Sequence, residues 1–276
     1  MDPTDDPLRR IAEALERLAA PAAAPCDWLA APAYVWSGVA RAVPSIEAPA
    51  LALLKGIDQQ KDRVTTNVAR LAQGQAAHDM LLWGARGMGK SALVRSAVKA
   101  AQADGGDVAL VQVASDSLPG IPALFGQLAA APRMFLVFID DLGFAEGDSV
   151  GPRHLRSWLD GGVEARPANV RLAVTSNRRA IVPRHLAEQD PGSLGPINPR
   201  DAVDDSLALA DRFGLALGFH ACSQDYYLAI VHGYAADLGL PVDEHEALEW
   251  SKRRGARSGR VAWHFITEVA GRSGAR

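Results

Sequence analysis

Residues 84–91 read Gly84-Ala85-Arg86-Gly87-Met88-Gly89-Lys90-Ser91, a complete G-x-x-x-x-G-K-S pattern that is typical of a phosphate-binding loop. The glycines let backbone N–H groups turn toward a phosphate without a clash from a Cβ atom. Lys90 offers a positive charge to the β- and γ-phosphates, and the Ser91 hydroxyl can ligate Mg²⁺. The apolar run 80–83 predicts a buried strand before the loop, and the Ala-rich segment 91–103 predicts a helix after it. A phosphate would then lie at a helix N-terminus, where the dipole favours negative charge.

Apolar strand patterns alternate with helical patterns after the loop. Strands are predicted at 108–113, 135–139, 170–175 and 215–219, and helices at 121–131 and 154–159. Fully apolar strands separated by helices favour a parallel sheet that is covered on both faces, so we expect an α/β core over residues 51–219. In such sheets, ligands bind at the carboxyl ends of the strands.

The last part of the chain is helical in pattern. Helices are predicted at 223–238, 243–254 and 258–269, and each opens with a residue type that caps helices: Ser223, Asp243 and Ser258. We therefore expect a small all-helical domain over residues 220–276.

The N-terminal part predicts a helix over residues 1–20, with apolar side chains at helical spacing. Its polar face is mixed in sign rather than basic, which favours a packing or oligomerisation helix over a membrane-binding one. Residues 21–50 are rich in Ala and Pro, and we interpret them as an irregular connector that packs in part on the main body.

Composition narrows the class of protein. The 276 residues suffice for one large domain or a core with a small second domain, and 48% hydrophobic content is that of a globular protein. A net charge of −3 gives no global argument for nucleic acid or an anionic membrane. Cys26 and Cys222 are the only cysteines, no zinc-type spacing occurs, and neither a secretory signal nor a membrane span is recognisable. We expect a soluble cytoplasmic protein.

Two acids follow the predicted strand 135–139. Asp140 occupies the position of a Mg²⁺-associated acid, and Asp141 that of an acid that activates water. Successive strand side chains point to opposite faces, so the two acids cannot share one task. Asn177 ends the next strand, where it could hold water or the γ-phosphate or simply terminate the strand. Arg212 and Arg260 could stabilise charge on the γ-phosphoryl group, although either residue alone is typical of a surface.

The order of these motifs resembles AAA+ ATPases: Gly84–Ser91, Phe138-Ile139-Asp140-Asp141, Thr175-Ser176-Asn177-Arg178-Arg179, Asp211-Arg212-Phe213-Gly214 and Ser258-Gly259-Arg260-Val261. Further segments resemble, more narrowly, an uncharacterised bacterial family of AAA+-type ATP-binding proteins: Gly56-Ile57-Asp58-Gln59-Gln60-Lys61, Leu82–Gly87, Gly162-Val163-Glu164-Ala165-Arg166-Pro167, Asp211–Leu215 and Ser223–Leu228. The resemblance spans residues 45–272 and implies a P-loop NTPase with a three-layer αβα core and a C-terminal helical lid.

The resemblance also implies a role for each matching residue. Gly56 and Ile57 would lie by the adenine of ATP, and the loop residues together with Leu93 would bind the nucleotide. Ser91 and Asp140 would hold Mg²⁺. Asp141 takes the place of the usual Glu and is one methylene shorter, and Asn177 resembles the first sensor residue. Arg212 resembles an arginine finger that acts on a neighbour's nucleotide, and Arg260 resembles the second sensor on the lid.

These features leave alternatives open. One is an ATPase that acts on an unidentified macromolecular partner, as a head-to-tail ring or filament if Arg212 acts in trans. Another is a nucleotide-gated switch or scaffold with little turnover, and a weaker one is a small-molecule kinase. Basic clusters at 252–260 and 178–184 could meet nucleic acid, but the near-neutral chain favours solvated surfaces and contacts to ATP. Trp158, Trp250 and Trp263 fall in helical patterns and are expected in the core.

Overall fold

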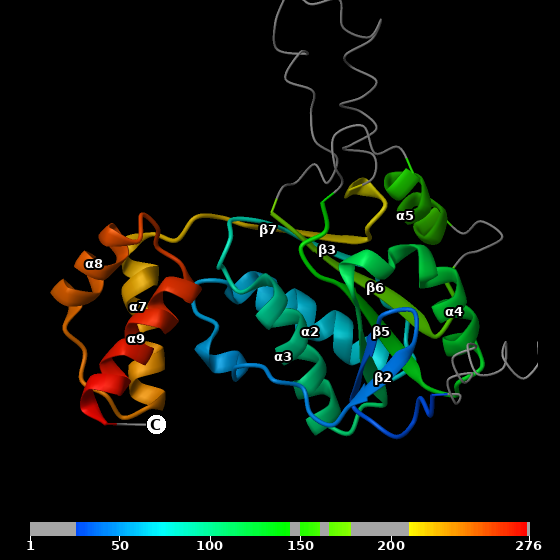
Figure 1. Cartoon of the computed structure of the whole chain (residues 1–276), viewed down its shortest axis with the longest axis horizontal. Helices are drawn as coiled ribbons and strands as arrows, with labels where there is room; N and C mark the ends of the chain where they lie inside the picture. The colour runs from blue at the N-terminus through cyan, green and yellow to red at the C-terminus, as the bar shows by residue number, and fades with distance from the viewer. Residues whose placement is uncertain (1–25, 144–149, 161–165, 178–209, 275–276) are drawn as a thin grey trace, which may run out of the picture.

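A computed structural model describes residues 26–143, 150–160, 166–177 and 210–274 (Figure 1). Its strands are β1 (Ala33–Trp36), β2 (Ala40–Val43), β3 (Met80–Gly84), β4 (Val108–Val113), β5 (Met134–Ile139), β6 (Val170–Ser176) and β7 (Leu215–Phe219). Its α-helices are α2 (Asp58–Ala72), α3 (Lys90–Ala103), α4 (Ile121–Ala129), α5 (Val150–Asp160), α7 (Gln224–Asp237), α8 (Glu244–Arg253) and α9 (Gly259–Ser273), with short 3₁₀ turns η1 (Leu51–Leu53) and η2 (Ser115–Gly120). The predicted helix over 1–20, the segment 162–165 and the arginines at 178, 179 and 184 lie outside the described residues.

The described strands form one sheet in the order β2-β1-β4-β5-β6-β3-β7. All neighbouring strands are parallel except β1 and β2, which form an antiparallel hairpin. The strands predicted from the apolar runs after residue 78 are all present, and their parallel pairing confirms the predicted α/β core. Parallel pairing places the carboxyl ends of β3, β5 and β6 at one edge, which is where the predicted phosphate loop and acids follow.

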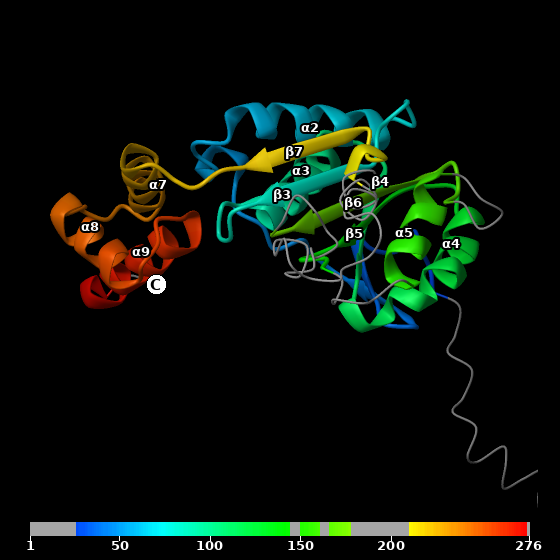
Figure 2. The same cartoon turned by 90° about the horizontal axis from the view of Figure 1, so that it is seen from above.

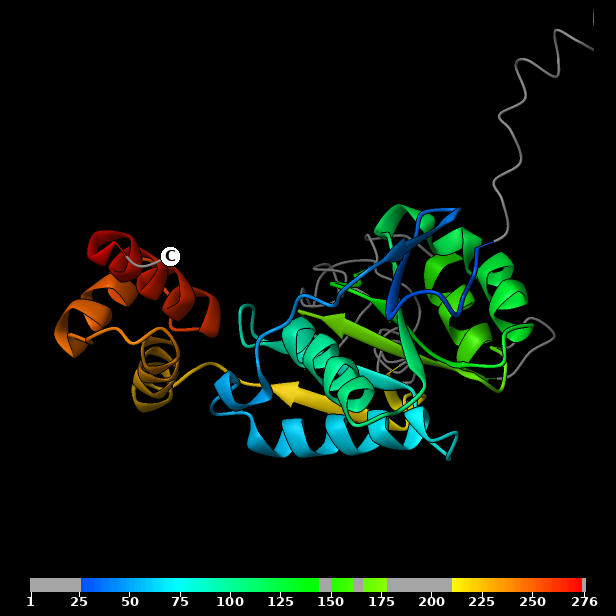
Figure 3. The same cartoon turned by 90° about the horizontal axis from the view of Figure 1, so that it is seen from below.

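Side-chain alternation along the strands explains the three layers. On β5, Phe135, Val137 and Ile139 enter a buried cluster with α4 and α5. Leu136 and Phe138 point the other way into a cluster with α2 and α3. Figures 2 and 3 show these two helix pairs on opposite sides of the sheet. Because both faces are covered, the central strand β5 is apolar along its whole length, as buried parallel strands favour.

The connector predicted over residues 21–50 is not irregular throughout, because it contains β1 and β2. Tyr34 and Trp36 are buried on one face of β1 and join the cluster around α4. β1 then pairs with β4 and so extends the sheet beyond it. A four-residue strand is too short to show a clear period in the sequence, and its pairing partner lies far along the chain.

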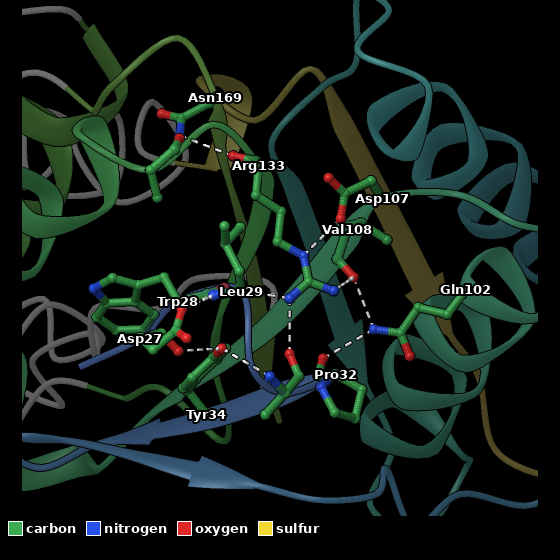
Figure 4. A network of polar contacts seen from close by, with 12 residues as sticks. Asp27, Trp28, Leu29, Pro32, Tyr34, Gln102, Asp107, Val108, Arg133 and Asn169 are labelled. Atoms are coloured by element: carbon green, nitrogen blue, oxygen red, sulfur yellow. Dashed lines mark hydrogen bonds and ion pairs between the residues drawn. The ribbon is translucent and has the colours of Figure 1, made fainter.

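Arg133, just before β5, holds the chain that leads into β1 (Figure 4). Its Nη1 donates to the carbonyl oxygens of Ala31 at 2.8 Å and Trp28 at 3.3 Å. Its Nε forms an ion pair with Asp107 Oδ1 at 2.8 Å. One planar guanidinium thus ties the segment before β1 to the ends of two central strands, because its donors lie in a fixed fork.

The C-terminal helices form a small domain with its own core, drawn at the left of Figure 1. Ser223, Asp243 and Ser258 cap α7, α8 and α9 as predicted, each side chain accepting a bond from a backbone N–H three residues on. Buried side chains such as Tyr227, Val231 and Phe265 face one another between these helices. Within the described ranges, no helix combines the length and apolarity needed to cross a membrane.

Candidate nucleotide site

The phosphate loop connects the end of β3 to the start of α3. Gly87 and Gly89 have φ angles of 74° and 85°, in the left-handed region that side chains with a Cβ rarely adopt. A Cβ atom at Gly87 would also lie 2.7 Å from Ser258 Oγ, on the lid. Gly87 is therefore required both by the turn of the loop and by the close approach of the lid.

Lys90 lies at the floor of the loop and is only 7% exposed. Its Nζ donates to the carbonyl oxygens of Gly84 at 2.8 Å and Ala85 at 2.9 Å, and to Asn177 Oδ1 at 3.3 Å. Burial lowers the pKa of Lys90, while the nearby carboxylates of Asp141 and Asp140 act in the opposite direction. The ammonium group is thus held in a fixed place beneath the loop, with carbonyl partners that a phosphate can replace.

The two acids after β5 have different partners. Asp140 Oδ1 accepts hydrogen bonds from Ser91 Oγ and Thr175 Oγ1, both at 2.6 Å. Asp141 takes a left-handed backbone with φ of 51°, and its N–H donates to Thr175 Oγ1 at 2.8 Å. The Asp141 carboxylate accepts a hydrogen bond from the Asn177 side-chain amide. The acids and Asn177 therefore meet at the carboxyl edge of β5 and β6, as the sequence predicts.

The lid reaches the loop through the start of α9. The Arg260 N–H donates to the Gly87 carbonyl oxygen at 3.3 Å. The Arg260 side chain lines the same cavity as Lys90, and its positive charge is close enough to lower the pKa of that lysine further. Arg260, which resembles the second sensor residue, is thus brought to the phosphate loop by the lid.

A cavity of about 1020 Å³ opens between the core and the lid. Its walls include most of the predicted site residues: Ile57, Arg86, Gly87, Met88, Gly89, Lys90, Ser91, Asp140, Asp141, Asn177 and Arg260. This volume is in the range of pockets that enclose small molecules and cofactors.

Some predicted binding residues do not line this cavity. Gly84 and Ala85 lie behind the loop, where their carbonyl groups hold Lys90. Leu93 is fully buried in the core beside α2. Gly56 packs against the Tyr226 ring, where a Cβ would lie 2.9 Å from a ring carbon. These four residues therefore lie outside the lining of the cavity.

Arg212 lies away from the cavity in its own chain. It precedes β7, whose other end at Phe219 meets the loop through a hydrogen bond from the Ala85 N–H of 2.8 Å. Its Nε forms an ion pair with Asp160 Oδ2 at 2.6 Å, at the end of α5. Arg212 is therefore not among the residues that line the cavity of its own chain.

Several cavity residues have no role assigned from the sequence. Thr175 connects the two acids, and Arg95 lies one helical turn beyond Ser91. Tyr234 and Trp263 enter the cavity from the lid. The expectation that Trp263 belongs to the core is wrong, since it is 46% exposed, whereas Trp158 is buried as expected. The sequence did contain a signal for the position of Trp263. It lies three residues after Arg260 on one helix, so the two side chains share a face.

The residues at the loop suit a magnesium ion. Ser91 and Asp140 present a hydroxyl and a carboxylate oxygen that meet at 2.6 Å, and Mg²⁺ prefers such oxygen ligands alongside substrate phosphates. Among the described residues, there is no group of three or more His, Cys, Asp or Glu side chains that could hold a metal ion without such help.

A family described as "Protein of unknown function (DUF815)" matches residues 29–273. The chain belongs to this family. The match includes β1 and β2, which the resemblance seen in the sequence did not reach. No curated protein matches the chain.

Two solved structures of RuvB share this fold. RuvB of Thermotoga maritima, described as a Holliday junction branch migration motor, is 16% identical with a TM-score of 0.50, covering 80% of this chain and 65% of that one. A variant of that RuvB has a TM-score of 0.54 at 16% identity, covering 82% and 66%. A replication initiator DnaA bound to AMPPCP and single-stranded DNA is 15% identical with a TM-score of 0.49, covering 78% and 61%. The chain thus has the fold of AAA+ P-loop ATPases, a three-layer αβα core with a helical C-terminal domain, over about two thirds of the RuvB length.

Proposed function

We propose that this protein binds ATP with Mg²⁺ and hydrolyses it, and that it acts on a macromolecular partner. The observation that carries the proposal is the convergence of Lys90, Ser91, Asp140, Asn177 and Arg260 on one cavity between core and lid. Cations beneath and above a glycine loop suit a polyphosphate, and neighbouring acids suit a metal ion and a water molecule.

Each residue has a separate task in this proposal. Lys90 and the loop N–H groups bind the β- and γ-phosphates, and Arg260 adds positive charge from the lid. Ser91 and Asp140 hold Mg²⁺, which neutralises charge on the phosphates when bound. Asp141 accepts a proton from the attacking water, and Asn177 orients that water or the γ-phosphate.

Nucleotide binding is tested with Lys90→Ala. We expect the wild-type protein to bind ATP in a calorimetric titration with Mg²⁺, and Lys90→Ala to lose at least tenfold in affinity, because a charge-assisted contact of this kind contributes roughly 1.5–3 kcal/mol. Lys99→Ala is the matched control, because Lys99 is an exposed lysine on the same helix. Equal affinity in all three proteins would exclude the site.

The alternative is a nucleotide-gated switch or scaffold with little turnover. It is favoured by Asp141, whose side chain is one methylene shorter than the usual Glu and is already bound by Asn177. Steady-state phosphate release separates the two functions. If the wild type releases phosphate and Asp141→Asn does not, the protein is an ATPase. If both proteins bind ATP tightly and neither releases phosphate, the switch is supported.

The exposed cations at the end of α8 do not define a nucleic-acid partner. Lys252 forms an ion pair with Glu249 at 2.7 Å, and the Arg254 guanidinium lies 4.9 Å from the centroid of the Trp250 ring. Some of these positive charges thus have partners within the lid. This supports the interpretation of the cluster as a solvated surface.

A further inference from the structure

Two aromatic side chains of the lid face the candidate nucleotide cavity. Tyr234 on α7 and Trp263 on α9 both line it, and their ring centroids lie 5.2 Å apart at an angle of 70°. This is the edge-to-face geometry that aromatic pairs prefer. Trp263 nevertheless keeps 46% of its surface exposed, so much of its ring has no protein partner.

Helix geometry explains how both rings reach the cavity. Residues one turn apart lie on the same face of a helix. On α9, Gly259, Arg260 and Trp263 share the face toward the cavity, whereas Ala262, Phe265 and Ile266 are buried in the lid. On α7, the cavity face holds Ile230, Tyr234 and Asp237. The Trp263 ring is therefore held by the same helix face that carries Arg260 to the phosphate loop.

The cavity walls combine polar and apolar groups. The phosphate loop, Asp140 and Asn177 supply charged and polar groups. The apolar side chains of Leu54 and Ile57, both buried, contribute to the wall from the segment before α2. A ligand that matches these walls combines a polyphosphate, for the loop, with a flat and largely apolar ring, for the lid aromatics.

We propose that Trp263, supported at its edge by Tyr234, is the stacking platform for the base of the bound nucleotide. The inference rests on the proposed nucleotide-binding function and names the part of the ligand that the lid recognises. Stacking reads the size of an aromatic face rather than its hydrogen-bonding edge. The lid therefore selects nucleotides with a purine base over those with a pyrimidine base, and over polyphosphate alone.

The test compares Trp263→Ala and Trp263→Phe with the wild type in calorimetric titrations with ATP, CTP and inorganic tripolyphosphate. Loss of a stacked ring weakens binding by about tenfold or more. We expect Trp263→Ala to lose about tenfold in ATP affinity and to keep its tripolyphosphate affinity. Trp263→Phe retains a ring and keeps ATP affinity within about threefold.

His264→Ala is the matched control, because His264 is an exposed neighbour on α9 that does not line the cavity. It should bind ATP as the wild type does, and circular dichroism should show all variants folded. ATP should also quench tryptophan fluorescence in Trp250→Phe but not in Trp263→Phe.

The failures of the two proposals are distinguishable. If the wild type binds neither ATP nor tripolyphosphate, the proposed function fails. If the wild type binds ATP and Trp263→Ala binds it equally well, the stacking platform alone is excluded. Equal loss of tripolyphosphate and ATP affinity in Trp263→Ala also excludes it, because the tryptophan then acts on lid structure rather than on the base.

Discussion

Asp79 carries a buried negative charge at the start of β3. It is 5% exposed, and its oxygens accept hydrogen bonds from Arg166 Nε at 2.8 and 2.9 Å. The Leu172 N–H on β6 donates to the same carboxylate at 2.8 Å. The acid thus joins two strands that carry site residues at their other ends, and it has the paired environment that a buried carboxylate needs.

Asp79→Ala should lower the free energy of unfolding by roughly 3–5 kcal/mol, because it leaves the Arg166 guanidinium and the Leu172 N–H without their acceptor. Chemical denaturation measures this change. The control is Asp58→Ala, which removes an ion pair with Lys61 from a side chain that is 74% exposed. That exposed pair should contribute less than about 1 kcal/mol. Similar losses in both variants would contradict a structural role of the buried charge.

Tyr227 makes the lid sensitive to alkaline pH. Burial raises the pKa of its phenol to about 12, and the hydroxyl donates to the Ala247 carbonyl oxygen at 3.1 Å. In the unfolded chain this pKa is about 10. Between pH 10 and 12, unfolding therefore releases a proton, and the free energy of unfolding falls as the pH rises. The contribution is fully present below pH 10 and is lost as the pH rises through 12.

Tyr227→Phe should remove up to about 3 kcal/mol of this alkaline decline, since each pKa unit corresponds to about 1.4 kcal/mol. Denaturation curves at a series of pH values from 9 to 12 measure the slope. Tyr226→Phe is the control, because Tyr226 is 54% exposed and adjoins Tyr227 in the sequence. An unchanged slope in Tyr227→Phe would show that another group controls the alkaline transition.

At the scale of elements, the β1–β2 hairpin covers an edge of the sheet that β4 would otherwise expose. Gln102 on α3 assists Arg133, since its amide donates to Pro32 O at 2.9 Å and Val108 O at 2.7 Å. Exposed strand edges pair readily with other chains. The hairpin thus replaces the β4 edge with the four-residue strand β2, and so short an edge strand offers little for another chain to pair with.

Arg133→Ala should release the segment before β1, because the carbonyl groups of Trp28 and Ala31 and the carboxylate of Asp107 lose their donor. We expect a loss of roughly 2–3 kcal/mol in unfolding free energy and faster amide hydrogen exchange in β1 than in β5. Arg133→Lys should recover little, because an ammonium group cannot match the fork of a guanidinium. Uniform exchange across the sheet would contradict this role.

The strands from β3 onward could be predicted because each is a buried apolar run between helical segments. β1, β2 and α2 could not be assigned in the same way. β1 gains its stability from a distant partner strand and from Arg133. α2 is mostly polar, and Val64, Val68 and Leu71 are the only large apolar side chains on its buried face. A local sequence pattern predicts a helix or strand well only where the element is completely buried or where the periodic pattern continues over many residues.

The sequence predicts the candidate site well where the chemistry depends on which residues directly follow a strand. The phosphate loop, Asp140, Asp141 and Asn177 follow directly after strands, and parallel pairing brings such positions together. Trp263 shows the limit, because a helical period reports that one face is apolar but not whether a core or a cavity covers it. Sequence spacing therefore predicts the part of the cavity formed by the loop better than the part formed by the lid.

At the scale of the whole molecule, Arg212 lies outside the cavity of its own chain. β7 separates it from the loop, and five strand residues extend about 15 Å. If Arg212 stabilises charge on a nucleotide, it does so in a neighbouring copy, in a head-to-tail contact that closes into a ring or continues as a filament.

Mixing two inactive variants tests this arrangement. Lys90→Ala lacks a working phosphate site but retains Arg212, and Arg212→Ala has the reverse defect. We expect each variant alone to show no ATPase activity and Arg212→Ala to bind ATP normally. An equal mixture should recover about one quarter of wild-type turnover, because half the chains have an intact site and half of their neighbours supply the arginine. Arg153→Ala, an exposed arginine on α5, is the control and should hydrolyse ATP alone. No recovery in a mixture shown by light scattering to co-assemble would mean that Arg212 stabilises its own subunit through Asp160 and has no role in a neighbour's site.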